Sequence, residues 1–163
     1  MFYGYAQTHY YQPLWTLVGA GIKNLSDSGR EMTEVMPAKV DWIPKRCAKI
    51  DPMKCELYLE DDLGSIKYDY LVVAVGIELD WNKVDGLTEA LKIDNSGVCS
   101  NYSSETVLKT WHTLKQFTGG HALFTFPNTP IKCAGAPQKI MYLTDSYLRK
   151  VIKLLIKISL CFN

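Results

Sequence analysis

Hydrophobic positions along the chain repeat with two different spacings, which separate the predicted helices from the predicted strands. Apolar residues at helical spacing, which marks a helix with one buried face, occur in three segments: 13–25, 105–117 and 138–149. Continuous or alternating apolar runs bounded by turn residues predict strands at 40–43, 46–50, 55–59, 65–70, 71–76 and 121–126. This mixture of helices and strands places the chain in the α/β class.

The predicted strands are of two kinds. Leu71–Gly76 is a continuous apolar run, which a strand buried on both faces of a parallel sheet requires. A small antiparallel hairpin insert is predicted from the strands at 46–50, 55–59 and 65–70, with a turn through Asp51 and Pro52. The loop-rich section after Gly76 is predicted to be a linker.

Composition narrows the class of protein. The chain has 163 residues, 47% of them hydrophobic, and a formal charge of +1. This suffices for one ordinary domain with a core, and it lacks the basic stripe expected of a nucleic-acid partner. Five cysteines without CxxC spacing argue against a metal site or a disulfide framework and favour reduced, intracellular thiols.

No apolar run approaches the ~20 residues that span a bilayer, and residues 1–8 lack the features of a secretory signal or a mitochondrial transit peptide.

Cys133 is the candidate for chemistry. It follows the apolar strand His121–Phe126 and precedes a helix whose first turn holds Pro137. Free amide donors and the positive end of the helix dipole stabilise a thiolate at such a place, and Lys132 and Lys139 add positive charge. Spacing alone favours the alternative that Cys133 is an inert small hydrophobic residue.

Val18–Asn24 contains two closely spaced glycines that could be taken for a pyrophosphate-binding turn. Asn24 stands where that fingerprint has its third glycine, and Pro13 comes too soon before the segment to allow a complete strand. Because the fingerprint needs a strand, a glycine turn and a helix in that order, we interpret the segment as part of a helix.

The run Phe124–Tyr142 (FTFPNTPIKCAGAPQKIMY) resembles the mitochondrial sulfide:quinone oxidoreductase family, flavoproteins of the two-dinucleotide-domain disulfide-reductase type. The resemblance extends from about His9 to about Lys150. It implies partial FAD/NAD(P)-binding Rossmann-type domains and an enzyme that oxidises hydrogen sulfide through a persulfide on Cys133. Electrons would pass through FAD to ubiquinone at the mitochondrial inner membrane, and glutathione or sulfite would accept the sulfane sulfur.

The resemblance also implies positions for the cofactor and the domains. Gln12, the main chain at Cys47, and Gly76 at the end of the apolar strand fall where family members contact FAD. Residues 1–98 would form a partial FAD-binding domain with the β insert, and residues 99–150 the start of a second dinucleotide-type domain. Residues 151–163 form a divergent tail.

The chain departs from the family in what it lacks. The upstream pyrophosphate fingerprint and the partner cysteine in the C-terminal half have no counterpart in this sequence. The alternative is therefore a truncated, catalytically inactive product that acts at most as a binding module.

The tail 151–163 has three possible interpretations. Lys150, Lys153 and Lys157 share one face of a possible helix, opposite apolar residues, as in a helix that lies on a membrane surface. The tail could also extend a helix over the core. The third interpretation, an aberrant ending to a shortened chain, is favoured because the family resemblance stops near Lys150.

Overall fold

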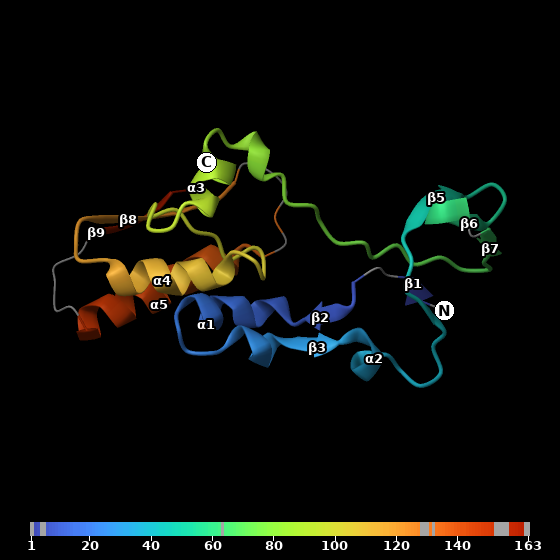
Figure 1. Ribbon diagram of the computed structural model, residues 1–163, viewed down its shortest axis with the longest axis horizontal. Helices are drawn as coiled ribbons and strands as arrows, with labels where there is room; N and C mark the ends of the chain where they lie inside the picture. Colours follow the sequence, from blue (N-terminus) through green and yellow to red (C-terminus); the bar gives the residue numbers. More distant parts are fainter. Residues whose placement is uncertain are drawn as a thin grey trace. The chain divides into compact units, whose positions relative to one another are not determined.

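The computed structural model describes residues 2–3, 6–62, 64–127, 131, 133–151 and 157–161. The chain divides into two compact units, which are drawn together in Figure 1. Unit 1 consists of Met1–Tyr10 and Gly29–Gly76, and unit 2 of Tyr11–Ser28 and Ile77–Asn163. The division into domains at residues 98 and 99 stays a prediction about the family.

Unit 1 contains the predicted antiparallel insert. Strands β5 (Cys47–Asp51), β6 (Glu56–Leu59) and β7 (Ser65–Lys67) form a three-stranded sheet in that order. Asp51 Oδ1 makes the turn between β5 and β6 by accepting hydrogen bonds from the Met53 and Lys54 N–H groups at 3.1 and 3.2 Å. Leu57 in β6 is only 2% exposed and gives this small sheet its core.

The other elements of unit 1 are short. Strand β1 (Phe2–Tyr3) pairs in parallel with β4 (Trp42–Ile43), which lies within the predicted strand 40–43. Strand β2 (Thr8–Tyr10) pairs antiparallel with β3 (Gly29–Glu31). The unit also contains α2 (Met32–Val35) and the 3-10 turn η3 (Glu60–Asp62).

The predicted strand Leu71–Gly76 is wrong for this chain. The segment has no regular secondary structure, and Val72 and Val75 are 87% and 88% exposed. A strand forms only where neighbouring strands pair with its N–H and C=O groups, and the described residues provide no such neighbour for this run. Gly76, with φ of 78°, turns the chain at its end.

Unit 2 contains the long helices. The predicted helices at 105–117 and 138–149 are confirmed as α4 (Val107–Gln116) and α5 (Gly135–Val151). The predicted helix at 13–25 is shorter, with η1 (Gln12–Leu14) leading into α1 (Trp15–Gly19), because the left-handed backbone of Gly21 (φ 73°) ends the helical path. The 3-10 turn η2 (Leu25–Ser28) follows.

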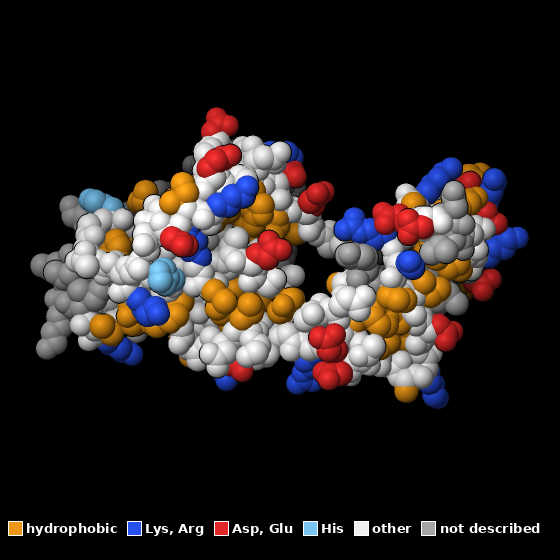
Figure 2. Space-filling model, in the orientation of Figure 1, with side chains coloured by type: hydrophobic (Ala, Val, Ile, Leu, Met, Phe, Trp, Pro, Cys, Tyr) orange, Lys and Arg blue, Asp and Glu red, His pale blue; other side chains and the backbone are white. Residues whose placement is uncertain are grey.

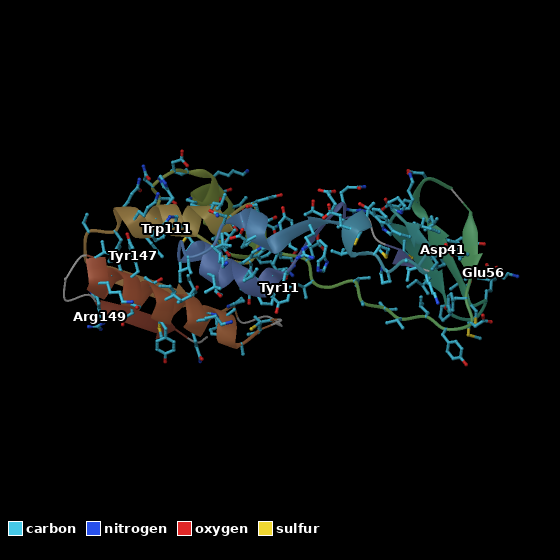
Figure 3. All side chains as sticks on the ribbon, turned by 90° about the horizontal axis from the view of Figure 1, so that it is seen from below. Tyr11, Asp41, Glu56, Trp111, Tyr147 and Arg149 are labelled. Carbon is cyan, nitrogen blue, oxygen red and sulfur yellow. The ribbon has the colours of Figure 1, made fainter. Side chains whose placement is uncertain are left out.

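The core of unit 2 lies where α1 packs against α4 and α5 (Figure 1). The side chains buried there include Trp15, Val18, Val107, Leu114, Ile140 and Leu148. In Figure 3, Trp111 of α4 and Tyr147 of α5 point toward one another, with ring centroids 4.9 Å apart in an edge-to-face arrangement. Aromatic pairs prefer this geometry, so the two rings form a favourable contact between α4 and α5.

The segment interpreted as a linker contains η4 (Trp81–Lys83) and α3 (Leu87–Lys92), two helical turns that the sequence prediction missed. The Lys109 ammonium of α4 binds this segment. Its three N–H donors are shared among four acceptors within 3.0 Å of Nζ, namely the carbonyl oxygens of Ala90, Leu91 and Ile93 and Ser96 Oγ. A cation at the end of a helix satisfies its last carbonyl groups, so the segment is anchored to α4.

The tail forms a strand where the sequence allowed a helix. Strand β9 (Lys157–Cys161) pairs in parallel with β8 (His121–Thr125), with Ala122 opposite Ile158. A membrane-surface helix through residues 157–161 is therefore wrong, and residues 152–156 lie outside the described residues. Within the described ranges, no helix is both long and apolar enough to cross a bilayer.

Candidate functional site

Cys133 lies two residues before Gly135, the first residue of helix α5, and the sequence predicts it a few residues ahead of a helix start. Its thiol is exposed and free of any disulfide. The Cys133 carbonyl oxygen accepts a hydrogen bond from the Ala136 N–H at 3.3 Å, which ties the cysteine backbone to the start of the helix. Pro137 is buried in the first turn of α5, where a missing N–H removes no intrahelical bond. Asn128–Pro130 and Lys132 lie outside the described residues.

The start of α5 favours negative charge. The first N–H groups of a helix have no intrahelical partners, and the positive end of the helix dipole lies there. Helix α5 is 17 residues long and has no acidic residue in its first turn. An anionic sulfur at Cys133 therefore meets no carboxylate from this turn.

Tyr102, in the loop before α4, lies within electrostatic range of Cys133. Burial raises the pKa of the Tyr102 phenol above its ordinary value, and the negative charge of a Cys133 thiolate raises it further. Ser100 holds this loop, because its Oγ accepts from the Tyr102 N–H at 3.3 Å and its carbonyl from Thr106 Oγ1 at 2.8 Å. Sequence reasoning missed Tyr102, since no spacing pattern relates it to Cys133.

The two glycines of Val18–Asn24 serve helix packing. A Cβ added to Gly19 would lie 2.6 Å from Asn101 Oδ1, and one added to Gly21 would run into the Trp111 ring. Asn101 is itself fixed, because its Oδ1 accepts from Thr110 Oγ1 at 2.6 Å and its Nδ2 donates to the Trp15 carbonyl at 3.5 Å. Protein atoms therefore fill the space that a pyrophosphate would need.

The residues predicted to contact FAD lie in different elements. Gln12 is exposed in η1 of unit 2, while Cys47 and Gly76 belong to unit 1. The Cys47 thiol is exposed and donates to the Lys49 carbonyl at 3.6 Å. Open space surrounds Gly76. These positions are accessible to a ligand, and their roles stay predictions.

The described residues do not fit a complete FAD site. A dinucleotide pyrophosphate binds where glycines bring backbone N–H groups of a helix N-terminus close to the phosphates. Gly19 is the last residue of α1 and Gly21 lies beyond it, and Asn101 and Trp111 fill the space beside them. Gln12, Cys47 and Gly76 could contribute only peripheral contacts to such a group.

Charged side chains of both signs are mixed on the face of the molecule drawn in Figure 2, over both units. Among the described residues, no three His, Cys, Asp or Glu side chains lie close enough together to hold a metal ion.

Cys99 is a second thiol of unit 2 that sequence reasoning did not single out. Burial raises the pKa of the Cys99 thiol above its usual value of 9.0, although hydrogen bonds with Thr110 and Thr113 and the charge of Lys109 oppose that rise. Cys99 is thus a half-buried thiol with a raised pKa, in contrast to the exposed Cys133.

The raised pKa of the half-buried Cys99 thiol predicts a loss of stability at alkaline pH. A raised pKa in the folded state means that the unfolded chain releases the thiol proton first, so stability is complete below pH 9.0 and falls as pH rises above it. Urea unfolding at pH 7, 9 and 10 should show a steeper decline for the natural chain than for Cys99→Ala. The tyrosines are the same in both proteins, so their titration cancels, and parallel declines would contradict the prediction.

No family model matches the chain, but individual proteins do. The chain is 52% identical over 149 residues to the mitochondrial sulfide:quinone oxidoreductase of Mus musculus. It is 44% identical to that of Dictyostelium discoideum and 38% identical to that of Schizosaccharomyces pombe. These matches cover 91%, 89% and 89% of this chain and 32% of each relative, so the chain spans about a third of their length.

The fold agrees with this relationship. The structure matches the sulfide:quinone oxidoreductase of Aquifex aeolicus with a TM-score of 0.74 and 20% identity, over 98% of this chain and 35% of that chain. This likeness confirms the predicted α/β class with partial dinucleotide-binding domains. In sequence and in fold, the chain is therefore similar to about a third of a sulfide:quinone oxidoreductase.

Proposed function

We propose that this chain is the part of a sulfide-oxidising flavoenzyme that carries the sulfur-accepting cysteine, and that Cys133 is that cysteine. The observation that carries the proposal is an exposed, free thiol two residues before the first residue of the 17-residue helix α5. A thiolate is the nucleophilic form of cysteine, and a helix start without acidic side chains stabilises it. Cys47 and Cys55 are equally free and exposed, but they lie in the hairpin of unit 1 and precede no helix.

In the proposed reaction, an S–S bond between Cys133 and a second cysteine is the oxidant of hydrosulfide. Hydrosulfide attacks the Cys133 sulfur within a disulfide or trisulfide to a second cysteine. A new S–S bond forms on Cys133 and its bond to the neighbouring sulfur breaks, so the partner cysteine leaves as a thiolate from the disulfide or as a persulfide from the trisulfide. Glutathione or sulfite then takes the outer sulfur and frees Cys133. Tyr102 lies close enough to respond to the charge that develops on Cys133.

The rest of the proposed activity belongs to the whole protein. FAD, when bound, would accept the two electrons of sulfide oxidation and pass them to ubiquinone. Gln12, Cys47 and Gly76 are the positions of this chain proposed to contact FAD. The relatives are named mitochondrial, and we place this activity at the mitochondrial inner membrane.

The test is direct transfer of sulfane sulfur to the protein. A Cys133 thiolate should attack sodium tetrasulfide and gain one sulfur atom, which intact-mass and peptide mass spectrometry would locate. We expect Cys133 to be modified at least about tenfold faster than Cys47 or Cys55, because only Cys133 lies at a helix start. Cys133→Ser should remove the fast phase, and Cys47→Ser should leave it unchanged. Equal rates at all three thiols would refute the proposal.

A binding module without catalysis is the second candidate for the isolated chain, and the filled space around Gly19 and Gly21 favours it. The purified chain should retain no flavin, because Asn101 and Trp111 fill the space beside Gly19 and Gly21, the glycines of its candidate pyrophosphate turn. Absorbance near the flavin bands after gel filtration with excess FAD measures this. A yellow protein whose absorbance bleaches with sulfide would contradict the prediction.

A further inference from the structure

The end of α3 surrounds the ammonium group of Lys109 with oxygen atoms. Four acceptors lie within 3.0 Å of the Lys109 Nζ, namely the carbonyl oxygens of Ala90, Leu91 and Ile93 and Ser96 Oγ. Within the described ranges, this ammonium forms no salt bridge with a carboxylate. Its charge is therefore balanced by peptide dipoles and a hydroxyl, as at a cation site built from neutral oxygen ligands.

The oxygen atoms are held in place by hydrogen bonds within their own segment. The Ser96 hydroxyl donates to the Ala90 carbonyl at 2.7 Å and accepts from the Val98 N–H at 3.2 Å. A hydroxyl has one donor and two acceptor positions, so its second lone pair is left for the ammonium. Asn95, with φ of 60°, turns the chain just before Ser96, a conformation that asparagine adopts more readily than most residues. The segment 90–96 thus forms the site by itself, and only the cation comes from outside it.

The distances indicate which kind of cation the site fits. They run from 2.7 to 3.0 Å, which is the usual length of an N–H···O hydrogen bond. Oxygen ligands lie closer to metal ions, at about 2.3–2.6 Å from Ca²⁺ and about 2.0–2.1 Å from Mg²⁺. A primary ammonium has three N–H donors for the four oxygens to share, whereas a quaternary ammonium has none. The size and the chemistry of the site therefore suit a primary ammonium.

We propose that the segment 90–96 is a binding site for primary ammonium cations, and that the Lys109 side chain is the ligand that occupies it in this chain. The proposal does not depend on sulfur chemistry at Cys133. Because the oxygen atoms belong to the segment, the site should accept a free alkylammonium once the lysine side chain is shortened. Beyond its Cβ, lysine consists of a propyl chain and the ammonium, so n-propylammonium matches the part that Lys109→Ala removes.

The test is chemical rescue of the whole chain. The N–H groups of Ala90 and Ile93 donate to the Gly86 and Glu89 carbonyls within the segment. Lys109→Ala should speed their amide hydrogen exchange at least about tenfold, because several charge-assisted hydrogen bonds are lost at once. Added n-propylammonium chloride should restore slow exchange with a saturable dependence on its concentration. Tetramethylammonium chloride at the same ionic strength carries the same charge without N–H donors and should restore nothing.

Two further variants control for charge and for space. Lys92→Ala removes an exposed lysine from the last position of α3 itself, and it should leave the exchange rates within about twofold of the natural chain. Lys109→Met fills the space with an uncharged side chain. It should speed exchange as Lys109→Ala does, but it should not respond to n-propylammonium.

Unchanged exchange in Lys109→Ala would overturn the proposal, and so would equal restoration by n-propylammonium and tetramethylammonium. A response of Lys109→Met to n-propylammonium would overturn it too, because no room for the amine remains there. If Lys109→Ala also loses the protection of the α4 amides, n-propylammonium should restore both helices, and no response would count against the proposal. Sulfur transfer to Cys133 is a separate measurement, so its failure would leave this result unaffected.

Discussion

Cys133→Ser is expected to abolish sulfide oxidation in a hybrid enzyme. In this hybrid, the residues of this chain replace the 149 matched residues of the mouse relative, which supplies the segments that this chain does not span. The unsubstituted hybrid should oxidise sulfide and reduce ubiquinone. The serine variant should lose about a thousandfold or more in kcat, the scale of loss seen when a nucleophile is removed, because a hydroxyl cannot carry a persulfide.

The matched control is Cys47→Ser in the same hybrid. Cys47 is exposed like Cys133, and the proposed flavin contact there uses the main chain. Its replacement should therefore leave kcat within about twofold, well below the effect of removing a reacting group. Retained activity in the Cys133→Ser hybrid, or an equal loss in the Cys47→Ser hybrid, would exclude Cys133 as the sulfur carrier.

Gly21→Ala is expected to destabilise the chain by about 2–4 kcal/mol, the sum of a left-handed backbone strain and a steric overlap of ordinary size. The backbone of Gly21 has φ of 73°, and an added Cβ would overlap the Trp111 ring. Trp111 also packs on Tyr147, so the overlap would disturb the contact between α4 and α5. Urea unfolding followed by tryptophan fluorescence would measure the change.

Gly97 provides the control that separates strain from overlap. Its φ is 75°, close to that of Gly21, but nothing lies within 4 Å of an added Cβ. Gly97→Ala should therefore lower stability by only about 1 kcal/mol, the strain alone. Equal losses at Gly97 and Gly21 would show that Trp111 does not limit the space at Gly21.

Much of the fold was predictable because local rules determine it. The periodic apolar spacing of α4 and α5, and the turn through Asp51, depend on residues close in sequence, and all three appear where the sequence places them. The predicted strand Leu71–Gly76 was wrong because strand formation depends on residues distant in sequence. Its own sequence suits a strand, but a strand needs partner strands that the described part of this chain does not supply.

The site could be predicted only in part, for a similar reason. The position of Cys133 before α5 follows from the break after an apolar strand and from Pro137, which are local signals. The proximity of Tyr102 depends on how the loop before α4 folds back, and Lys109 reaches α3 across a tertiary contact. The spacing of α3 gave too little signal, since a helix of six residues is marginal without such a contact.

The single ammonium of Lys109 has a consequence for the order of assembly. Three carbonyl oxygens and one hydroxyl between Ala90 and Ser96 converge on this one atom, and Lys109 is in position only when α4 exists. Helix α3 is too short to persist by itself. Folding of residues 87–96 must therefore wait for α4, and acetylation of Lys109 would release that segment while the longer helix stays formed.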